Sequence, residues 1–155
     1  MSVTYELQRV ADDESSTADL ALAVTHALPK RLLIGLIGTL GAGKTRFVKG
    51  LAVGLGIPAE NVTSPTFVLC QSHHGRCLLH HLDAYRVADD DESFELGVDE
   101  RIEEDAITVI EWSNRFAHLL PAERLDIQVD VVSETKRVFH FLATGTEAVE
   151  TLRRL

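Results

Sequence analysis

Eight consecutive residues have the types and spacing that phosphate binding requires. They read Gly38-Thr39-Leu40-Gly41-Ala42-Gly43-Lys44-Thr45 and match the full pattern G-x-x-x-x-G-K-[ST]. Glycines let the backbone wrap with its N–H groups pointing inward, and they place no Cβ in the way of a phosphate oxygen. The lysine can reach the β and γ phosphates, and the threonine hydroxyl can ligate a bridging Mg²⁺. The pattern predicts a phosphate-binding loop (P-loop) for a nucleotide with Mg²⁺.

An acid is also needed beside such a loop, and two stand at the ends of apolar runs. Asp83 follows residues 77–82, and Glu111 follows residues 107–110. Either carboxylate could hold Mg²⁺, directly or through water, and either could position an attacking water, so both roles stay open for both. Between the loop and these acids, Thr63-Ser64-Pro65-Thr66 places hydroxyls on a proline-stiffened turn. Thr66 is a candidate sensor of the γ-phosphate.

The elements on either side of the loop fit its function. Residues 32–37 form a continuous apolar run, which is typical of a strand buried on both faces. A helix is predicted from Lys44 to about Leu55, and its N-terminal N–H groups and positive dipole end would meet the same anion. A strand, a glycine turn and a helix in this order indicate an α/β domain.

The remaining elements complete one domain spanning residues 1–155. A short strand is expected at 4–10, and Ser15-Ser16-Thr17 is expected to cap a helix that runs to about Leu28. Two hairpins are predicted, one pairing 66–72 with 77–82 through His73 to Arg76, the other pairing 125–132 with 137–143. Short acidic helices at 91–104, a strand at 107–111 and a helix at 113–120 lie between them. The expected fold is a P-loop NTPase-like domain with a central mixed sheet, parallel and antiparallel, flanked by helices.

The bulk composition narrows the function. A net charge of −9 argues against non-specific nucleic-acid binding by this chain alone, because phosphate contacts need a basic face. The N-terminal residues show no signal-peptide pattern, and no apolar run approaches the roughly 20 residues of a membrane span. The two cysteines suit a reducing compartment. A cytoplasmic protein with no membrane association is expected.

Acidic residues are concentrated in the middle of the chain. The stretch from 83 to 111 holds 12 of the 24 acids and only two basic residues, Arg86 and Arg101. Two interpretations stay open: a solvated helical face, and a docking surface for a basic partner.

Cysteines and histidines near the first hairpin have spacings that resemble a zinc site. They are Cys70, His73, His74, Cys77, His80 and His81. With a two-residue turn at His74-Gly75, Cys70, Cys77 and His81 would share one sheet face and His80 would point to the other. A tetrahedral set does not assemble from that arrangement, so zinc is disfavoured.

Five motifs in this order resemble the TsaE (YjeE) family of bacterial P-loop ATPases, which serve in making threonylcarbamoyladenosine on tRNA. Besides the P-loop, they are Ser64-Pro65-Thr66-Phe67, His81-Leu82-Asp83-Ala84-Tyr85-Arg86, Leu96-Gly97 and Ile110-Glu111-Trp112. The resemblance covers roughly residues 12–143. The P-loop alone is shared by very many proteins, whereas the combination in a short chain is highly specific.

The resemblance implies a weak, partner-stimulated ATPase that binds ATP and Mg²⁺. It implies that the TsaD and TsaB proteins are partners and that tRNA is reached through them. The metal residues would be Thr45 and Glu111, and the catalytic set Lys44, Asp83, Glu111 and Thr66. Nucleotide contacts would come from the loop (Gly38, Leu40, Gly41, Ala42, Gly43, Lys44, Thr45), from the adjoining Arg46, and from Arg137, Thr17 and Trp112.

This chain departs from the family pattern at two positions. Thr39 stands where aspartate is usual, and Arg46 stands where a second threonine is common. Neither side chain is essential to the phosphate cradle, but the local charge becomes more positive and the hydrolysis rate could differ. Two alternatives remain: a small-molecule kinase, which would need an acceptor pocket and an arginine-bearing lid, and a nucleotide-dependent binding module without meaningful turnover.

Overall fold

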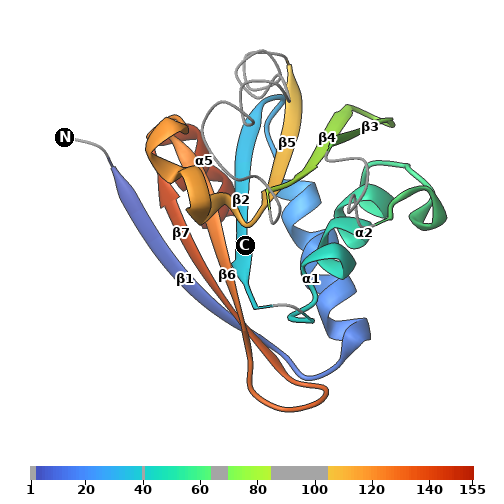
Figure 1. The fold of residues 1–155 in the computed structure, drawn as a ribbon. Coiled ribbons are helices and arrows are strands. Elements are labelled where there is room, and N and C mark those ends of the chain that lie inside the picture. Colours follow the sequence, from blue (N-terminus) through green and yellow to red (C-terminus); the bar gives the residue numbers. More distant parts are fainter. Residues whose placement is uncertain (1–2, 40, 64–69, 85–104) are drawn as a thin grey trace.

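The computed structural model describes residues 3–39, 41–63, 70–84 and 105–155. Its centre is a seven-stranded sheet with the order β1-β7-β6-β2-β5-β4-β3 (Figure 1). The strands are β1 (Thr4–Ala11), β2 (Leu32–Gly38), β3 (Cys70–His74), β4 (Leu78–Asp83), β5 (Ala106–Glu111), β6 (Arg124–Val131) and β7 (Arg137–Thr144). The helices are α1 (Glu14–Ala27), α2 (Lys44–Gly54) and α5 (Thr146–Arg153), with 3₁₀ turns η1 (Ala59–Asn61) and η2 (Ser113–Leu119).

The sheet has a parallel centre and antiparallel edges. Strands β6, β2, β5 and β4 run parallel to one another. β3 pairs antiparallel with β4, and β7 and β1 continue antiparallel from β6. The predicted mixed α/β sheet is therefore confirmed. In such a sheet the carboxyl ends of the parallel strands meet along one edge, which is where ligands bind.

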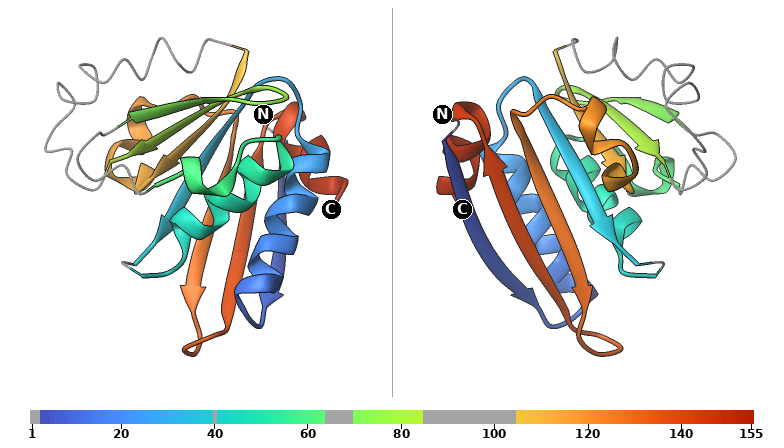
Figure 2. Two further views of the ribbon diagram at one scale, coloured as in Figure 1. Left: turned by 90° about the vertical axis from the view of Figure 1, so that its right-hand side faces the viewer. Right: turned by 60° about the vertical axis from the view of Figure 1, so that its left-hand side comes forward.

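The three α-helices pack on one face of the sheet (Figure 2). Buried apolar side chains of all three join those of the strands in one core, among them Val24 of α1, Phe47 of α2 and Leu152 of α5. α1 and α2 also contact each other closely, and an added Cβ at Gly50 would lie 2.6 Å from the Ala21 Cβ. Among the described residues, the α-helices therefore flank the sheet on one side.

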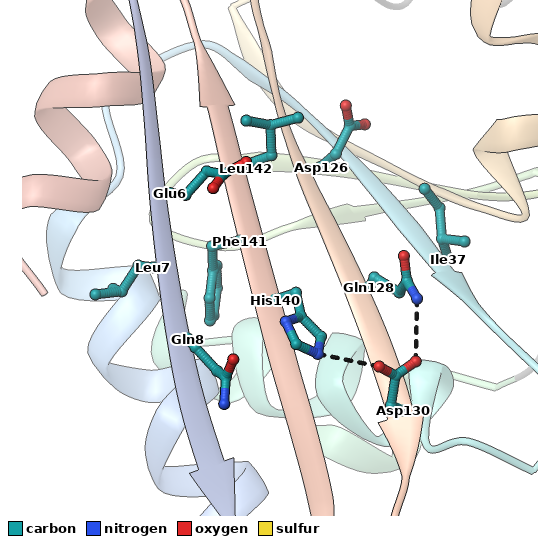
Figure 3. Close-up of a pocket in the computed structure, with 10 residues that line it drawn as sticks. All are labelled: Glu6, Leu7, Gln8, Ile37, Asp126, Gln128, Asp130, His140, Phe141 and Leu142. Atoms are coloured by element: carbon teal, nitrogen blue, oxygen red, sulfur yellow. Dashed lines mark hydrogen bonds and ion pairs between the residues drawn. The ribbon is translucent and has the colours of Figure 1, made fainter.

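On the opposite face, the described residues form a smaller apolar cluster and a hollow. A smaller apolar cluster of Leu33, Leu82, Ala84, Ile110 and Leu120 lies there, beside η2. Beyond it, β1, β7 and β6 leave a hollow of about 690 Å³, shown in Figure 3. There the Asp130 carboxylate accepts a hydrogen bond from Gln128 Nε2 at 3.1 Å and lies 3.0 Å from His140 Nε2. This half of the sheet is apolar on one face and polar on the other.

The first helix begins earlier than Ser15-Ser16-Thr17 predicts. Its N-cap is Asp13, whose carboxylate accepts a hydrogen bond from the Ser16 backbone N–H at 2.7 Å. Aspartate accepts this bond as readily as serine, so the cap lies two residues upstream of the predicted position. Thr17 is instead inside the helix and buried.

The first hairpin closes through Gly75, Arg76 and Cys77 rather than His74-Gly75. His74 pairs with Leu78 and Cys70 with Leu82. The physical reason is a close approach: an added Cβ at Gly75 would lie 2.7 Å from Ile57 Cγ1, so the glycine belongs at that contact. The predicted faces are therefore wrong, because Cys70 shares its face with His80, and His81 lies on the other face.

Two helical elements follow β5 in the described chain, one of them predicted from the sequence and one not. The helix predicted at 113–120 is present as a 3₁₀ helix at residues 113–119, and Leu120, its C-cap, is extended as expected before a proline. The sequence reasoning missed α5, which follows Gly145 at φ 94°.

The predicted acidic helices at 91–104 lie outside the described residues. Within the described residues, none of the helices has the length and apolarity to cross a membrane.

Candidate nucleotide and magnesium site

The P-loop connects β2 to α2 and is shaped by glycines. Gly41 has φ +78° and Gly43 φ +102°, a left-handed region that favours glycine. Space within 4 Å of an added Cβ is open at both. Gly43 is the N-cap of α2 and makes no side-chain cap hydrogen bond, and the first turn holds no acid. The helix N-terminus is thus left for an anion.

Lys44 lies folded over this loop. Its Nζ donates to the carbonyl oxygens of Gly38 at 2.8 Å and Thr39 at 2.9 Å, and the side chain is almost fully buried. Burial lowers the pKa of the ammonium group, against the opposing charges of Glu111 and Asp83. The lysine is therefore already enclosed and held in the loop before any ligand arrives.

Thr45 and Glu111 meet directly. The Thr45 hydroxyl donates to the Glu111 carboxylate, with oxygen separations of 3.3 and 3.2 Å. Glu111 is only 3% exposed, although it ends a strand. The two residues predicted to share the metal are thus brought together from α2 and β5.

Asp83 lies in register beside Glu111. The two are partners in the parallel pairing of β4 and β5, and Glu111 also pairs with Leu36 of β2. Paired residues point to the same face, so both carboxylates lie on the face that α2 covers. Both are buried, and both act on the charge of Lys44. The sheet register places two acids and one lysine around the start of α2.

Trp112 follows Glu111 in an unusual backbone conformation. Its φ is 65°, the only positive value of a non-glycine residue in the described chain. Such values are rare outside glycine and concentrate at functional sites. The backbone N–H donates to Leu36 O at 2.8 Å, and the indole ring centroid lies 4.0 Å from Lys44 Nζ. The left-handed turn places the ring against the lysine as a cation–π partner.

Two arginines hold the loop and its helix from outside. Arg137 Nε donates to the carbonyl oxygen of Ala42 at 3.0 Å, and Nη1 donates to Ser133 O at 2.8 Å. Arg46 Nη2 lies 3.0 Å from a carboxylate oxygen of Glu14, in a largely exposed pair. Arg137 thus contacts the P-loop backbone, while the Arg46 side chain links the first turns of α1 and α2.

Some predicted residues cannot be compared with the structure. Leu40 and Thr66, with the rest of Ser64 to Phe67, lie outside the described residues. Tyr85, Arg86, Leu96 and Gly97 do as well. Thr17 is buried in the first turns of α1, on the helix that packs against α2.

One neighbour of the site was not predicted. His81 is 0% exposed, and its Nε2 contacts the Glu111 carboxylate at Oε2. The sequence offered one indication: His81 lies two residues before Asp83 on a predicted strand, and residues i and i+2 share a sheet face. The contact with Glu111 could not be predicted from this, because the sequence alone does not show that β4 pairs with β5 in parallel register.

The chemistry of these groups fits a nucleotide phosphate and Mg²⁺. An uncapped helix N-terminus and a buried lysine suit phosphate oxygens, and a hydroxyl beside carboxylates suits a hard cation. No group of three or more His, Cys, Asp or Glu able to hold a metal by itself exists in the described part of the chain.

Comparison with known proteins places the chain in a family. The family model described as "Threonylcarbamoyl adenosine biosynthesis protein TsaE" matches residues 11–139. Two proteins named "tRNA threonylcarbamoyladenosine biosynthesis protein TsaE" are similar along most of their length. The one from Treponema pallidum is 41% identical over 128 residues, 83% of this chain and 94% of that protein. The one from Bacillus subtilis is 38% identical over 138 residues, which are 88% of this chain and 85% of that protein.

A solved structure shows the same fold. The crystal structure of Bacillus subtilis YdiB superposes with a TM-score of 0.81 at 29% identity, covering 97% of this chain and 94% of that one. The family match and the shared fold both cover most of the chain. The chain belongs to the TsaE family of threonylcarbamoyladenosine biosynthesis proteins.

Proposed function

We propose that this protein binds ATP with Mg²⁺, hydrolyses it slowly, and thereby supports threonylcarbamoyladenosine formation on tRNA through TsaB and TsaD. The observation that carries the proposal is the convergence of Lys44, Thr45 and Glu111 where β2, β5 and α2 meet. The family membership supplies the pathway. The partners come from the sequence resemblance, and the acidic charge of −9 suits a subunit that leaves tRNA contact to others.

Phosphate binding uses charge and backbone donors. The α2 N-terminus offers N–H groups without a competing side-chain cap, and Lys44 exchanges its bonds to Gly38 O and Thr39 O for bonds to phosphate oxygens. Because the lysine is already desolvated, little water remains to be displaced when it meets that charge. The exchange starts from an ammonium group that lies 4.0 Å from the centroid of the Trp112 ring.

Thr45 and Glu111 are the residues that would hold Mg²⁺. The ion, when bound, neutralises charge on the phosphate oxygens. We assign the water-orienting role to Asp83. The contact of Glu111 with the Thr45 hydroxyl suits that carboxylate to the metal, and Asp83 is the next carboxylate along the strand ends, near enough to act on the charge of Lys44. In hydrolysis the water oxygen attacks the γ-phosphorus, ADP departs, and the water proton passes toward this carboxylate.

The test is multiple-turnover threonylcarbamoyladenosine formation in a reconstituted reaction with the cognate TsaB and TsaD. It is run without this protein, with it, and with its Lys44→Ala variant. We expect product beyond the first turnover only with the wild-type chain. Equal yield in all three reactions would reject the pathway role, and the kinase alternative would then be tested by searching for a phosphorylated small acceptor.

The assignment of the two acids has its own test. Asp83→Asn should lower single-turnover hydrolysis about 10²-fold or more while Mg²⁺·ATP still binds, as expected for loss of a water-positioning group. Glu111→Gln should weaken the Mg²⁺ dependence of binding itself. The reverse pattern in the two variants would exchange the roles.

A further inference from the structure

We infer that His81 is a positioning residue, which orients the Glu111 carboxylate toward the Thr45 hydroxyl and so prepares the Mg²⁺ position. This inference rests on the proposed function and adds to it a residue for which no role was predicted. The structural basis is a connected chain of three side chains from three elements: His81 on β4, Glu111 on β5 and Thr45 on α2.

The direction of the hydrogen bond follows from the groups. The Glu111 carboxylate also accepts from the Thr45 hydroxyl, and an ionised carboxylate has no proton to donate. The contact between His81 Nε2 and Glu111 Oε2 is therefore a donation by the imidazole. His81 must carry its proton on Nε2, which fixes the tautomer and leaves a lone pair on Nδ1 if the ring is neutral.

The surroundings of the ring indicate a role beyond packing. Nδ1 is buried and has no hydrogen-bond partner among the described residues, and the whole residue is 0% exposed. A buried polar atom without a partner is costly. If His81 only filled space between Leu79 and Asp83 on that face, an apolar side chain of similar size would avoid that cost. The hydrogen bond to Glu111 offsets the free-energy cost of burying the unpartnered Nδ1.

Rigidity is the effect that the geometry gives. Glu111 rotates about its side-chain bonds unless its carboxylate is held by more than one partner. Here the Thr45 hydroxyl contacts both carboxylate oxygens, and His81 contacts Oε2 from a second element. Histidine on a sheet strand has only two rotatable bonds, so it fixes a partner at little entropic cost. Groups that orient a metal-binding residue in this way typically change metal affinity 10- to 100-fold when removed.

The chain provides a matched control in the adjacent histidine. His80 is also buried, at 4% exposure, but it lies on the other face of β4, where its Nδ1 is 2.8 Å from Ser72 Oγ. A substitution there disturbs the same strand and removes the same ring without touching Glu111. His81→Gln is the rescue variant, because the glutamine Nε2–H₂ lies close to where the imidazole Nε2–H stood.

The experiment compares wild type, His81→Leu, His81→Gln, His80→Leu and Lys44→Ala. Two binding constants are measured for each: that of ADP in EDTA, by calorimetry, and that of Mn²⁺ for the ADP complex, by electron paramagnetic resonance. We expect His81→Leu to bind ADP within about two-fold of wild type but to weaken Mn²⁺ by 10- to 100-fold. His81→Gln should recover most of that loss, and His80→Leu should resemble wild type. Lys44→Ala should lose ADP affinity.

A spectroscopic measurement covers the case in which His81→Leu fails to fold. Long-range ¹H–¹⁵N spectra of the wild-type protein should show His81 with its proton on Nε2, and Glu111→Gln should shift that resonance. Protonation of Nδ1 alone would overturn the inference, as would a His81→Leu variant with wild-type Mn²⁺ affinity. If wild type binds neither ADP nor Mn²⁺ with ADP, the proposed function fails as well. If only His81→Leu departs from expectation, only this inference fails.

Discussion

The two halves of the sheet use their strands differently. In the parallel half, β2, β5 and β4 are buried on both faces along most of their length, and the two carboxylates, Asp83 and Glu111, stand at the carboxyl ends. The antiparallel half consists of β7 and its two antiparallel partners, β1 and β6. There β6 and β7 alternate: one face enters the helix-covered core and the other carries Gln128, Asp130 and His140 beside an open hollow. Chemistry in this protein is placed at strand ends, and stability along strand faces.

The difference has a physical origin. Strand ends of a parallel sheet bring side chains from separate chain segments to one line, so charges that are distant in sequence meet. An antiparallel strand with one solvated face gains its stability from the apolar side chains of its inner face. Substitutions in the two halves should therefore separate activity from stability.

The largest expected effect is on stability in the antiparallel half. Phe141 of β7 is 1% exposed, and Phe141→Ala should lower the free energy of unfolding by about 3–5 kcal/mol through lost burial and a cavity. Leu142→Ala, the adjacent residue on the open face, should cost no more than about 1 kcal/mol. Urea unfolding measures both. Equal losses of unfolding free energy in the two variants would show that Leu142 is as well packed as Phe141, contrary to the solvated face described here.

Next is Lys44→Met in the parallel half. Loss of the phosphate-binding charge should lower nucleotide affinity about 10²–10³-fold, as for other charge-stabilising donors. The melting temperature should fall by less than about 4 °C, because the methionine stem keeps the packing and removes a buried charge. Calorimetry and thermal unfolding provide the two numbers. If Lys44→Met lost much of its stability but kept wild-type nucleotide affinity, Lys44 would serve stability and not binding, and the proposed difference between the two halves would be wrong.

A smaller effect is expected at the cap that joins β1 to α1. Asp13→Ala should lower the melting temperature by about 2–4 °C at pH 7, while Asp12→Ala, the adjacent exposed acid, should not. The hydrogen bond from Ser16 lowers the pKa of Asp13 in the folded state. Its contribution is thus complete above the unfolded pKa and is lost as pH falls through the lowered folded pKa. Urea midpoints from pH 7 to pH 3 should show the variant and wild type converging at the acidic end.

The smallest effect should come from the polar network of the open face. His140 and Asp130 form an exposed pair, with 45% and 46% of their side-chain surfaces accessible. His140→Gln should change the free energy of unfolding by less than about 1 kcal/mol and leave nucleotide affinity unchanged. A large loss of binding in that variant, measured by calorimetry, would connect the two halves and break the comparison.

Local patterns in the sequence predicted the P-loop well, because the chemistry of Gly38 to Thr45 and the apolar run before it are encoded in adjacent residues. The pairing of Thr45 with Glu111 followed only through the family resemblance. The contact of His81 with Glu111 was not predicted, since it depends on the register of two parallel strands 30 residues apart in the chain.

The structure also differs from the predictions at the first hairpin, at the first N-cap and at α5, and the reasons are not the same. The first hairpin closes at Gly75 because that residue meets the segment after α2, a contact between distant parts of the chain. The N-cap at Asp13 was within reach of local reasoning, since aspartate caps as well as serine. The α5 helix lay beyond the motifs, and only its burial against α1, β1 and β7 identifies it.

Trp112 gives the protein a built-in optical probe. The chain has one tryptophan, and its indole stacks 4.0 Å from the lysine ammonium that phosphate would engage. Intrinsic emission excited at the indole band therefore arises from a single ring beside the P-loop. Any event that draws Lys44 away from that ring should change its intensity or wavelength, so occupancy of the site can be followed in unlabelled protein and in real time.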